Sequence, residues 1–458
     1  MVRAALLQIM KEKPMLQVTR RTTLSETWFR VVPDPSPPLE VVKCADTDAK
    51  ALWESRLERE STVPFASGCY QWNVVFFDTA PESDADGIDT CSLGTFNVDE
   101  CTKKRRVLHG SKAGGHDTYI GWTFSHGICD GTSRLAILAE FIQLIGEQLE
   151  CKEIKARSSA SAEQALPASL HSRCREVASE RMLHVQQKMS EFFGGDDAPP
   201  PLLAECDSDC QDARHTGLLH RWLSAEDSEA LVGAGKAHST TVLGMVAAAA
   251  AHAMIAAAGA ATSKAGVSPM TDERSQGCIS PKTIRWGTPV NARSWVRPPV
   301  SADVVGSFTT MTKCVSQYLP DFWAQAKTMR EDVHSSLKSL TPEEFAGVKI
   351  PFTSSETLLA GIAKQASVHF GRKNLFFYIS NIGIMDVADH PLLQLADIKW
   401  GVSEHAVGAC VALFCGTFRG QLVLCMNYYT PYMSAKSARA LLDEIVLTLT
   451  EVARNLEV

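Results

Sequence analysis

His126 and Asp130 are the residues of this chain whose types and spacing best suit proton-transfer chemistry. An imidazole has an ordinary pKa of about 6.5, so it can take a proton from a hydroxyl or an amine while that group attacks a carbonyl. Residues 119–124 alternate apolar and small side chains, which indicates a buried strand, and a turn with two glycines follows, where positive φ is tolerated. Thr132 and Ser133 are suited to cap the helix predicted after that turn.

The spacing leaves the role of Asp130 open. Its carboxylate could orient the imidazole of His126, or it could face away and hold the turn through a cation elsewhere in the chain. A buried structural histidine beside a helix cap is a third interpretation, because a short H-x-x-x-D pattern also occurs by chance. Motifs elsewhere in the chain are needed to choose among these.

Four stretches together resemble a known superfamily. Residues 125–131, Ser-His-Gly-Ile-Cys-Asp-Gly, resemble the H-x-x-x-D-G signature of the CoA-dependent acyltransferases, which include chloramphenicol acetyltransferase, the plant BAHD enzymes, fungal alcohol acetyltransferases and the condensation domains of peptide synthetases. The other three follow in that superfamily's order: Pro289-Val-Asn-Ala-Arg293, with Pro298, Pro299 and Gly306 after it; Ser380-Asn381-Ile-Gly383, similar to an S-N-x-G strand end; and Asp397-Ile-Lys-Trp400-Gly401, similar to the BAHD D-F-G-W-G motif. Four motifs in order, spread over nearly the whole chain, make a fairly specific match.

The resemblance implies a role for each residue around the histidine. His126 would be the general base, and Gly131 would belong to the turn. Arg293 would pair with Asp130, so that the aspartate keeps the shape of the turn; a guanidinium suits this because it binds a carboxylate bidentately and stays charged. The alternative is that Arg293 is an exposed residue at a strand end.

The resemblance also assigns residues further along the chain. Asp397, Trp400 and Gly401 would be structural, with Asp397 bracing a loop. Ser380 and Asn381 could donate hydrogen bonds to the oxyanion that forms when a thioester carbonyl becomes tetrahedral. A plain turn explains an Asn beside a Gly equally well.

The chain departs from the superfamily pattern at two places. Ser125 stands where many relatives carry a second histidine, which favours the CoA-using branches over peptide-synthetase condensation domains. Ile398 and Lys399 replace the Phe and Gly of the BAHD motif. The 458 residues also contain no adjoining carrier domain that we recognise.

Length and pattern predict an α/β protein of two domains. A chain of 458 residues exceeds what one hydrophobic core supports, and 45% apolar residues suffice for two. Residues 194–201, Gly-Gly-Asp-Asp-Ala-Pro-Pro-Pro, cannot continue a helix. We therefore expect domains at 1–193 and 217–458, joined by a crossover at 194–216. By resemblance, each is a chloramphenicol acetyltransferase-like mixed sheet flanked by helices, with the active-site tunnel between them.

Composition excludes some classes of function. A net charge of −7 argues against nucleic acid as a partner, because phosphate binding needs a basic surface. Many of the 14 cysteines lie in apolar runs, which is typical of reduced thiols in an intracellular protein, and no secretory signal is visible, so we expect a cytoplasmic location. The apolar, alanine-rich run 242–262 predicts a buried helix rather than a membrane span. Residues 411–418 and 422–429 predict a hairpin around Arg419-Gly420.

Two further patterns have both a plain and a functional interpretation. Cys206, Cys210, His215 and His220 have spacings that zinc sites use, but a polar linker explains them better, and we expect no metal. The basic run 103–106 is typical of a solvated face, although it could also lie near the phosphates of an acyl-CoA.

The resemblance therefore implies an acyltransferase that moves an acetyl or other short-to-medium acyl group from acyl-CoA to an alcohol, or less readily an amine. The acceptor would be a small-molecule, pigment or lipid alcohol, the product an ester, and the enzyme a monomer without a permanently bound cofactor. Two alternatives stay open. One is a carrier-protein-dependent condensation enzyme, and the other is a binding protein that has kept the fold without turnover.

Overall fold

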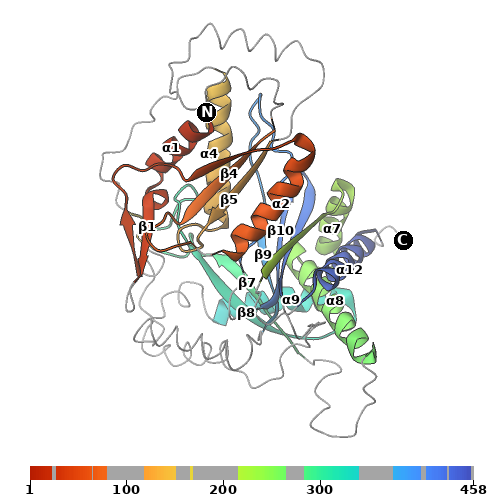
Figure 1. Ribbon diagram of the computed structural model, residues 1–458. Coiled ribbons are helices and arrows are strands. Elements are labelled where there is room, and N and C mark those ends of the chain that lie inside the picture. Colours follow the sequence, from red (N-terminus) through yellow and green to blue (C-terminus); the bar gives the residue numbers. More distant parts are fainter. Residues whose placement is uncertain are drawn as a thin grey trace.

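The computed structural model of the chain describes residues 1–22, 27–63, 65–79, 118–150, 166–168, 215–264, 283–339, 375–403, 409–430 and 433–454. These residues form two lobes, each a sheet flanked by helices (Figure 1). The α/β class expected from the sequence is confirmed. The expected crossover at 194–216 lies outside the described residues except for its last two, which begin strand β6.

The first lobe contains a three-stranded sheet of order β3-β4-β5. Its strands are β3 (Leu39–Lys43), β4 (Trp72–Asp78) and β5 (Tyr119–Phe124), with β3 parallel and β5 antiparallel to β4. A separate antiparallel pair consists of β1 (Val18–Thr22) and β2 (Thr27–Val31).

Helices cover both faces of this sheet (Figure 1). Helix α2 (Asp46–Thr62) packs Trp53 against Val75 and Phe77 on one face. On the other face, α1 (Val2–Glu12), the short 3-10 helix η1 (Pro14–Gln17) and α4 (Gly131–Leu149) share a core with Trp72. Side chains alternate along a strand, so Trp72 and Val75 face opposite layers. The position of α4 is therefore fixed by packing on the same strands that end beside His126.

The second lobe contains a six-stranded sheet. Its strands, in sheet order, are β6 (His215–Trp222), β11 (Gln421–Thr430), β10 (Ala409–Phe418), β9 (Leu375–Ile384), β7 (Thr283–Asn291) and β8 (Thr309–Gln317). Strand β9 runs parallel to β7 and β10, and the other neighbours are antiparallel. One face is covered by α7 (Ala225–Ala237), α8 (Val242–Lys264), α9 (Phe322–Ser339) and α12 (Ala435–Arg454).

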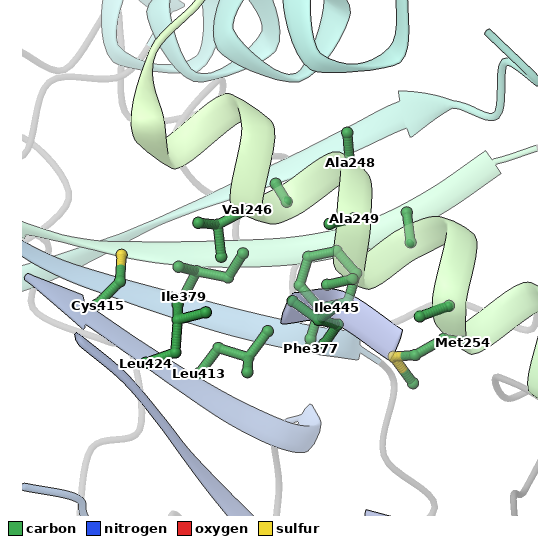
Figure 2. Packing of buried hydrophobic residues seen from close by; sticks show 14 of the residues in the cluster. Val246, Ala248, Ala249, Met254, Phe377, Ile379, Leu413, Cys415, Leu424 and Ile445 are labelled. Carbon is green, nitrogen blue, oxygen red and sulfur yellow. The ribbon is translucent and has the colours of Figure 1, made fainter. Parts of the chain in front are cut away.

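The alanine-rich run forms α8, at the centre of this lobe's core. Residues 247–251 are five consecutive alanines, all fully buried, and their small side chains let the helix lie close to the sheet. Figure 2 shows Val246 and Ala249 of α8 above Phe377 and Ile379 of β9. Among the described residues no single helix is both long and apolar enough to cross a membrane; α7 and the start of α8 pass that test only as a pair bent by 97°.

The predicted hairpin is confirmed. Strands β10 and β11 pair in register from Val411 opposite Tyr428 to Phe418 opposite Gln421. The two residues between them, Arg419 and Gly420, have φ of 50° and 77°. Positive φ at both central positions is the requirement of a type I′ turn, whose twist matches that of the strands.

The second face of the six-stranded sheet is turned toward the first lobe. An apolar cluster there includes Phe414 and Trp400, and Leu135 of α4 packs against it. Nearby, the carboxylate of Glu58 in α2 accepts a hydrogen bond from the backbone N–H of Leu218 in β6 at 3.3 Å. The two lobes therefore meet along α2 and the first turns of α4, which is where the His126 turn lies.

Candidate active site

His126 lies in the turn between β5 and α4, as the strand-turn-helix pattern predicts. The helix cap differs from the expectation. Asp130, not Thr132 or Ser133, is the N-cap residue, and its carboxylate accepts a hydrogen bond from the backbone N–H of Ser133 at 2.9 Å. A capping carboxylate satisfies one of the free N–H groups of the first turn and interacts favourably with the helix dipole.

The glycines of the turn also serve a different purpose from the one expected. Neither Gly127 nor Gly131 has positive φ. A Cβ added at Gly131 would lie 3.2 Å from a methyl group of Ile382 in the second lobe. Gly131 therefore eases the close approach between the lobes, and its backbone conformation does not call for glycine.

The carboxylate of Asp130 is buried and fully used by its neighbours. It is 1% exposed, and its Oδ2 accepts from the Arg293 guanidinium at 2.5 Å and from the Phe308 N–H at 2.9 Å. Although burial acts to raise the pKa of Asp130, the hydrogen bonds from Arg293, Ser133 and Phe308 lower it below its ordinary value. Asp130 is thus an ionised structural group, directed into the interface between the lobes.

Arg293 follows β7 and is itself buried, at 4% exposure. Besides Asp130, its guanidinium donates to the Ser133 hydroxyl at 2.9 Å and to the Val304 carbonyl at 3.1 Å, and it lies over the Phe308 ring. Its own backbone N–H donates to the side chain of Asn291 at 3.1 Å. The pair of Arg293 with Asp130 that the resemblance implied is present, and the surface alternative for Arg293 is wrong.

A cavity of about 1420 Å³ opens beside the His126 turn and is lined by both lobes. The first lobe contributes residues of α2, β5 and α4, and the second contributes Ile382 of β9 and the segment 392–403. His126 is an exposed residue on the wall of this cavity. Its ring is therefore accessible to a molecule inside the cavity, which is the arrangement a general base requires.

The surroundings of His126 favour the neutral imidazole. Although His126 is exposed to the cavity, the cavity walls around it still desolvate the ring, and this effect and the nearby positive charge of Arg134 lower the pKa of His126, against opposing effects from its own backbone and from Asp130. The Ser307 hydroxyl lies 3.5 Å from Nδ1, at the outer limit of a hydrogen bond. Sequence reasoning missed Ser307, whose only signal is that it follows Gly306 in the Arg293 motif.

Cys129 also lines the cavity, between the histidine and the aspartate. Its side chain is buried, and burial raises the pKa of the thiol to about 12. Because a thiol is nucleophilic only as the thiolate, Cys129 is inert at neutral pH.

Ile382 of β9 lines the cavity, but its neighbours Ser380 and Asn381 on the same strand do not. Ser380 shares the strand face of Ile382, since their positions differ by two. Asn381 is exposed, and its side-chain oxygen accepts from the Gly383 N–H at 2.9 Å, where Gly383 has a φ of 76°. The side-chain oxygen of Asn381 therefore stabilises the local turn, and the oxyanion role of its N–H₂ group stays a prediction.

The Asp397 motif also lines the cavity. Asp397 is exposed there, whereas Trp400 is buried in the cluster that faces the first lobe. A Cβ added at Gly401 would collide with the Asn427 side chain, at 2.3 Å from its oxygen. Gly401 thus allows the segment 392–403 to lie against β11.

Lys399, which replaces the glycine of the family motif, ties this wall to the first lobe. Its side chain is only 1% exposed, and its ammonium group donates to Glu54 of α2 at 2.6 Å and lies 5.0 Å from the Trp53 ring. Sequence reasoning noted the substitution but did not find this contact. Only its positive charge, placed between the apolar Ile398 and Trp400, could have pointed to it.

Several sequence patterns fall partly or wholly outside the described residues. Cys206, Cys210 and the basic run 103–106 do so entirely. His215 and His220 lie on β6 five positions apart, which places them on opposite faces of the strand. No group of metal-ligating side chains occurs among the residues that the structure describes.

No family model matches the chain, and no curated protein matches it in sequence. Solved structures match over almost its full length. Trichothecene 15-O-acetyltransferase TRI3 from Fusarium sporotrichioides aligns with a TM-score of 0.64 and 12% identity, covering 98% of this chain and 86% of that chain.

Two further structures belong to multidomain synthases. The epimerization domain from the third module of tyrocidine synthetase B has a TM-score of 0.59 and 13% identity, over 99% of this chain and 88% of that chain. The condensation domain of the Monacolin K polyketide synthase MokA has a TM-score of 0.59 and 10% identity, over 99% and 89%. At such identities the likeness concerns the fold. The chain therefore has the two-lobed, chloramphenicol acetyltransferase-like fold that these structures share.

Proposed function

We propose that this protein transfers an acyl group from acyl-CoA to an alcohol, with His126 as the general base. The proposal rests on the separate roles of His126 and Asp130 in the turn. The His126 ring faces a cavity shared by both lobes, whereas the Asp130 carboxylate is committed to Arg293, Ser133 and Phe308. Such an arrangement presents a base to a reactant while a separate charge pair holds the turn.

The proposed reaction has two steps. We assign the tautomer in which Nδ1 carries the proton and faces the Ser307 hydroxyl, because this leaves the lone pair of Nε2 free to accept a proton. As Nε2 takes the hydroxyl proton, the acceptor oxygen bonds to the thioester carbon and forms a tetrahedral oxyanion. When this collapses, the carbon–sulfur bond breaks, the ester is released, and the CoA thiolate takes the proton back from the imidazolium.

Direct transfer accounts for the reaction without an acyl-enzyme. Cys129 is the thiol within the signature turn, and its raised pKa of about 12 keeps it protonated. We therefore propose a ternary complex in which acyl-CoA and the alcohol meet beside His126. Initial-rate kinetics that intersect, rather than run parallel, are the expected signature.

A carrier-bound acyl donor is the second candidate, because the matching structures include the condensation and epimerization domains of synthases. The two donors are tested by offering the same acyl group on CoA and on a pantetheinylated carrier protein, with a panel of alcohols and amines, and with His126→Ala as the blank. We expect ester formation from acyl-CoA. Product from the carrier alone would favour the condensation reaction, and bound acyl-CoA without any product would favour a binding protein.

A further inference from the structure

Arg134 is a charged residue on an otherwise apolar wall. It lies in the first turn of α4 and lines the cavity, as does His126. The residues of α4 that line the cavity with it recur at helical spacing and are apolar beyond this first turn: Leu135, Leu138, Phe141, Ile142, Ile145 and Leu149. The cavity face of this helix therefore carries a cation only at the end nearest His126.

The side chain of Arg134 is half-buried and makes no hydrogen bond or ion pair with the described residues. The nearest carboxylate along the chain, Asp130, is taken by Arg293. Two further acids line the cavity. Glu60 bonds Arg56 and Asn73, both at 2.7 Å, and Asp397 lies outside ion-pair distance of Arg134. Among the residues that the structure describes, the half-buried guanidinium of Arg134 therefore has no counter-ion, and it is complementary to an anion inside the cavity.

The charge of Arg134 acts on the groups around the turn. It lowers the pKa of His126 after the larger effect of desolvation, and it also acts on Cys129 and on the half-buried Tyr378 of β9. An anion bound to Arg134 would therefore lie close to the base. A reactant that carries an anionic group close to its reacting carbon could place that group on Arg134 while the carbon lies beside His126, since both residues line the same cavity.

We propose that Arg134 binds a carboxylate carried by one of the two reactants, and so makes the enzyme selective for a carboxylate-bearing acyl group or acceptor. This inference rests on the proposed acyl transfer for its kinetic consequence, but anion binding itself does not require turnover. A guanidinium suits the role because its fork holds a carboxylate bidentately. Arg134 would determine specificity, whereas His126 would perform the proton transfer.

The kinetic test compares matched reactants that differ only in a carboxylate. Succinyl-CoA is compared with butyryl-CoA as donor, and hydroxybenzoate with hydroxybenzyl alcohol as acceptor, in wild type, Arg134→Gln and Arg134→Lys. We expect wild type to prefer the carboxylate in one of the two arms by on the order of tenfold to a hundredfold in kcat/KM. Arg134→Gln should abolish that preference, and Arg134→Lys should keep part of it. Lys50→Gln, which removes another cavity cation, should leave it unchanged.

Binding without turnover separates a failure of this inference from a failure of the proposed function. The His126 imidazole resonances are followed by NMR while succinate, or its neutral analogue succinamide, is added to the full-length protein. Succinate should perturb them in wild type and Lys50→Gln, but not in Arg134→Gln, even if no acyl donor is used. If Arg134→Gln melts at a lower temperature than wild type, Arg134→Met is used as a second variant that lacks the guanidinium.

Two results would overturn the inference. One is no carboxylate preference in either arm, together with equal responses to succinate and succinamide. The other is an equal loss of kcat in Arg134→Gln for carboxylate and neutral reactants, measured at a pH well above the acidic limb of both proteins so that protonation of His126 does not contribute. That result would assign the guanidinium to the oxyanion of the transition state instead.

Discussion

The guanidinium of Arg293 and the carboxylate of Asp130 meet at 2.5 Å, although 163 positions separate them in the chain. The contact joins the end of β7 in one lobe to the cap of α4 in the other. Both groups are nearly inaccessible to solvent, at 5% and 1% side-chain exposure. The turn that presents His126 is thus held from the opposite side of the lobe interface.

Breaking this buried pair should lower the free energy of unfolding. Arg293→Met leaves the Asp130 carboxylate buried without its partner, which costs about 3–5 kcal/mol of unfolding free energy. Chemical denaturation of wild type and Arg293→Met measures this loss of unfolding free energy. Arg221→Gln is the control, because its pair with Asp443 is exposed at 37% and 57% and is worth about 0–1 kcal/mol. Equal costs for the two variants would contradict the structural role of Arg293.

The carboxylate of Asp130 should make the free energy of unfolding depend on pH in the acid range. Its pKa is lowered in the folded protein, so its contribution is present above its unfolded value of about 3.9 and is lost as pH falls through the lower folded value. Asp130→Asn should be less stable than wild type at neutral pH, with the difference narrowing in acid. A difference that stays constant with pH would show that the charge of Asp130 is not the stabilising feature.

The Glu54–Lys399 contact predicts an asymmetry between its two partners. Lys399 is 1% exposed at its side chain and Glu54 is 44% exposed. Glu54→Gln leaves a buried ammonium without its counter-charge, whereas Lys399→Met fills the same space with apolar atoms and leaves an exposed carboxylate. Thermal melts should therefore show a larger loss for Glu54→Gln. The reverse order would indicate that Lys399 is not buried as the structure has it.

Gly401 should tolerate no side chain. Gly401→Ala forces a Cβ against Asn427, and such overpacking costs about 1–3 kcal/mol. Gly233→Ala is the matched control, because it lies in the interior of α7 with nothing within 4 Å of an added Cβ. It should be neutral or gain about 0.5–1 kcal/mol, since alanine favours helix. Denaturation midpoints of the two variants, measured side by side, check the contrast.

Local pattern was sufficient to predict the elements around the site. The alternation over residues 119–124, the helix after Gly131 and the hairpin at Arg419-Gly420 depend on neighbouring residues, so the sequence contains their signal. The contact of Arg293 with Asp130 was reached only through family resemblance, because spacing alone does not say which distant residues meet.

Residues that act across the interface were missed or misassigned. Nothing local marks Glu54 as the partner of Lys399, or Ser307 as a neighbour of His126. The oxyanion role of Asn381 stays a prediction, because its side-chain oxygen accepts from Gly383 two residues later, whereas the donor that such a role needs is its N–H₂ group. Asp130 was overlooked as the cap since Thr132 and Ser133 are also good capping residues. Which residue caps a helix, or which partner a side chain bonds, depends on which of several competing contacts forms in the folded chain.

The pH dependence of the reaction rate should reflect the lowered pKa of His126. Desolvation and Arg134 favour the neutral ring, so the acidic limb of the rate profile should lie below pH 6.5, with rate lost as pH falls and the base becomes protonated. Measuring kcat/KM against pH gives this limb directly. In Arg134→Gln the limb should move toward higher pH, because the neighbouring positive charge is gone. A limb unaffected by this substitution would contradict the assignment to His126.

Substituting His126 tests the central claim most directly. His126→Ala should lower the rate of acyl transfer from acyl-CoA by on the order of 10²- to 10⁴-fold, the usual contribution of a general base. Its melting temperature should stay near that of wild type, because the Asp130 network does not include the ring. A stable His126→Ala protein that retained full acyl-transfer activity would contradict the account.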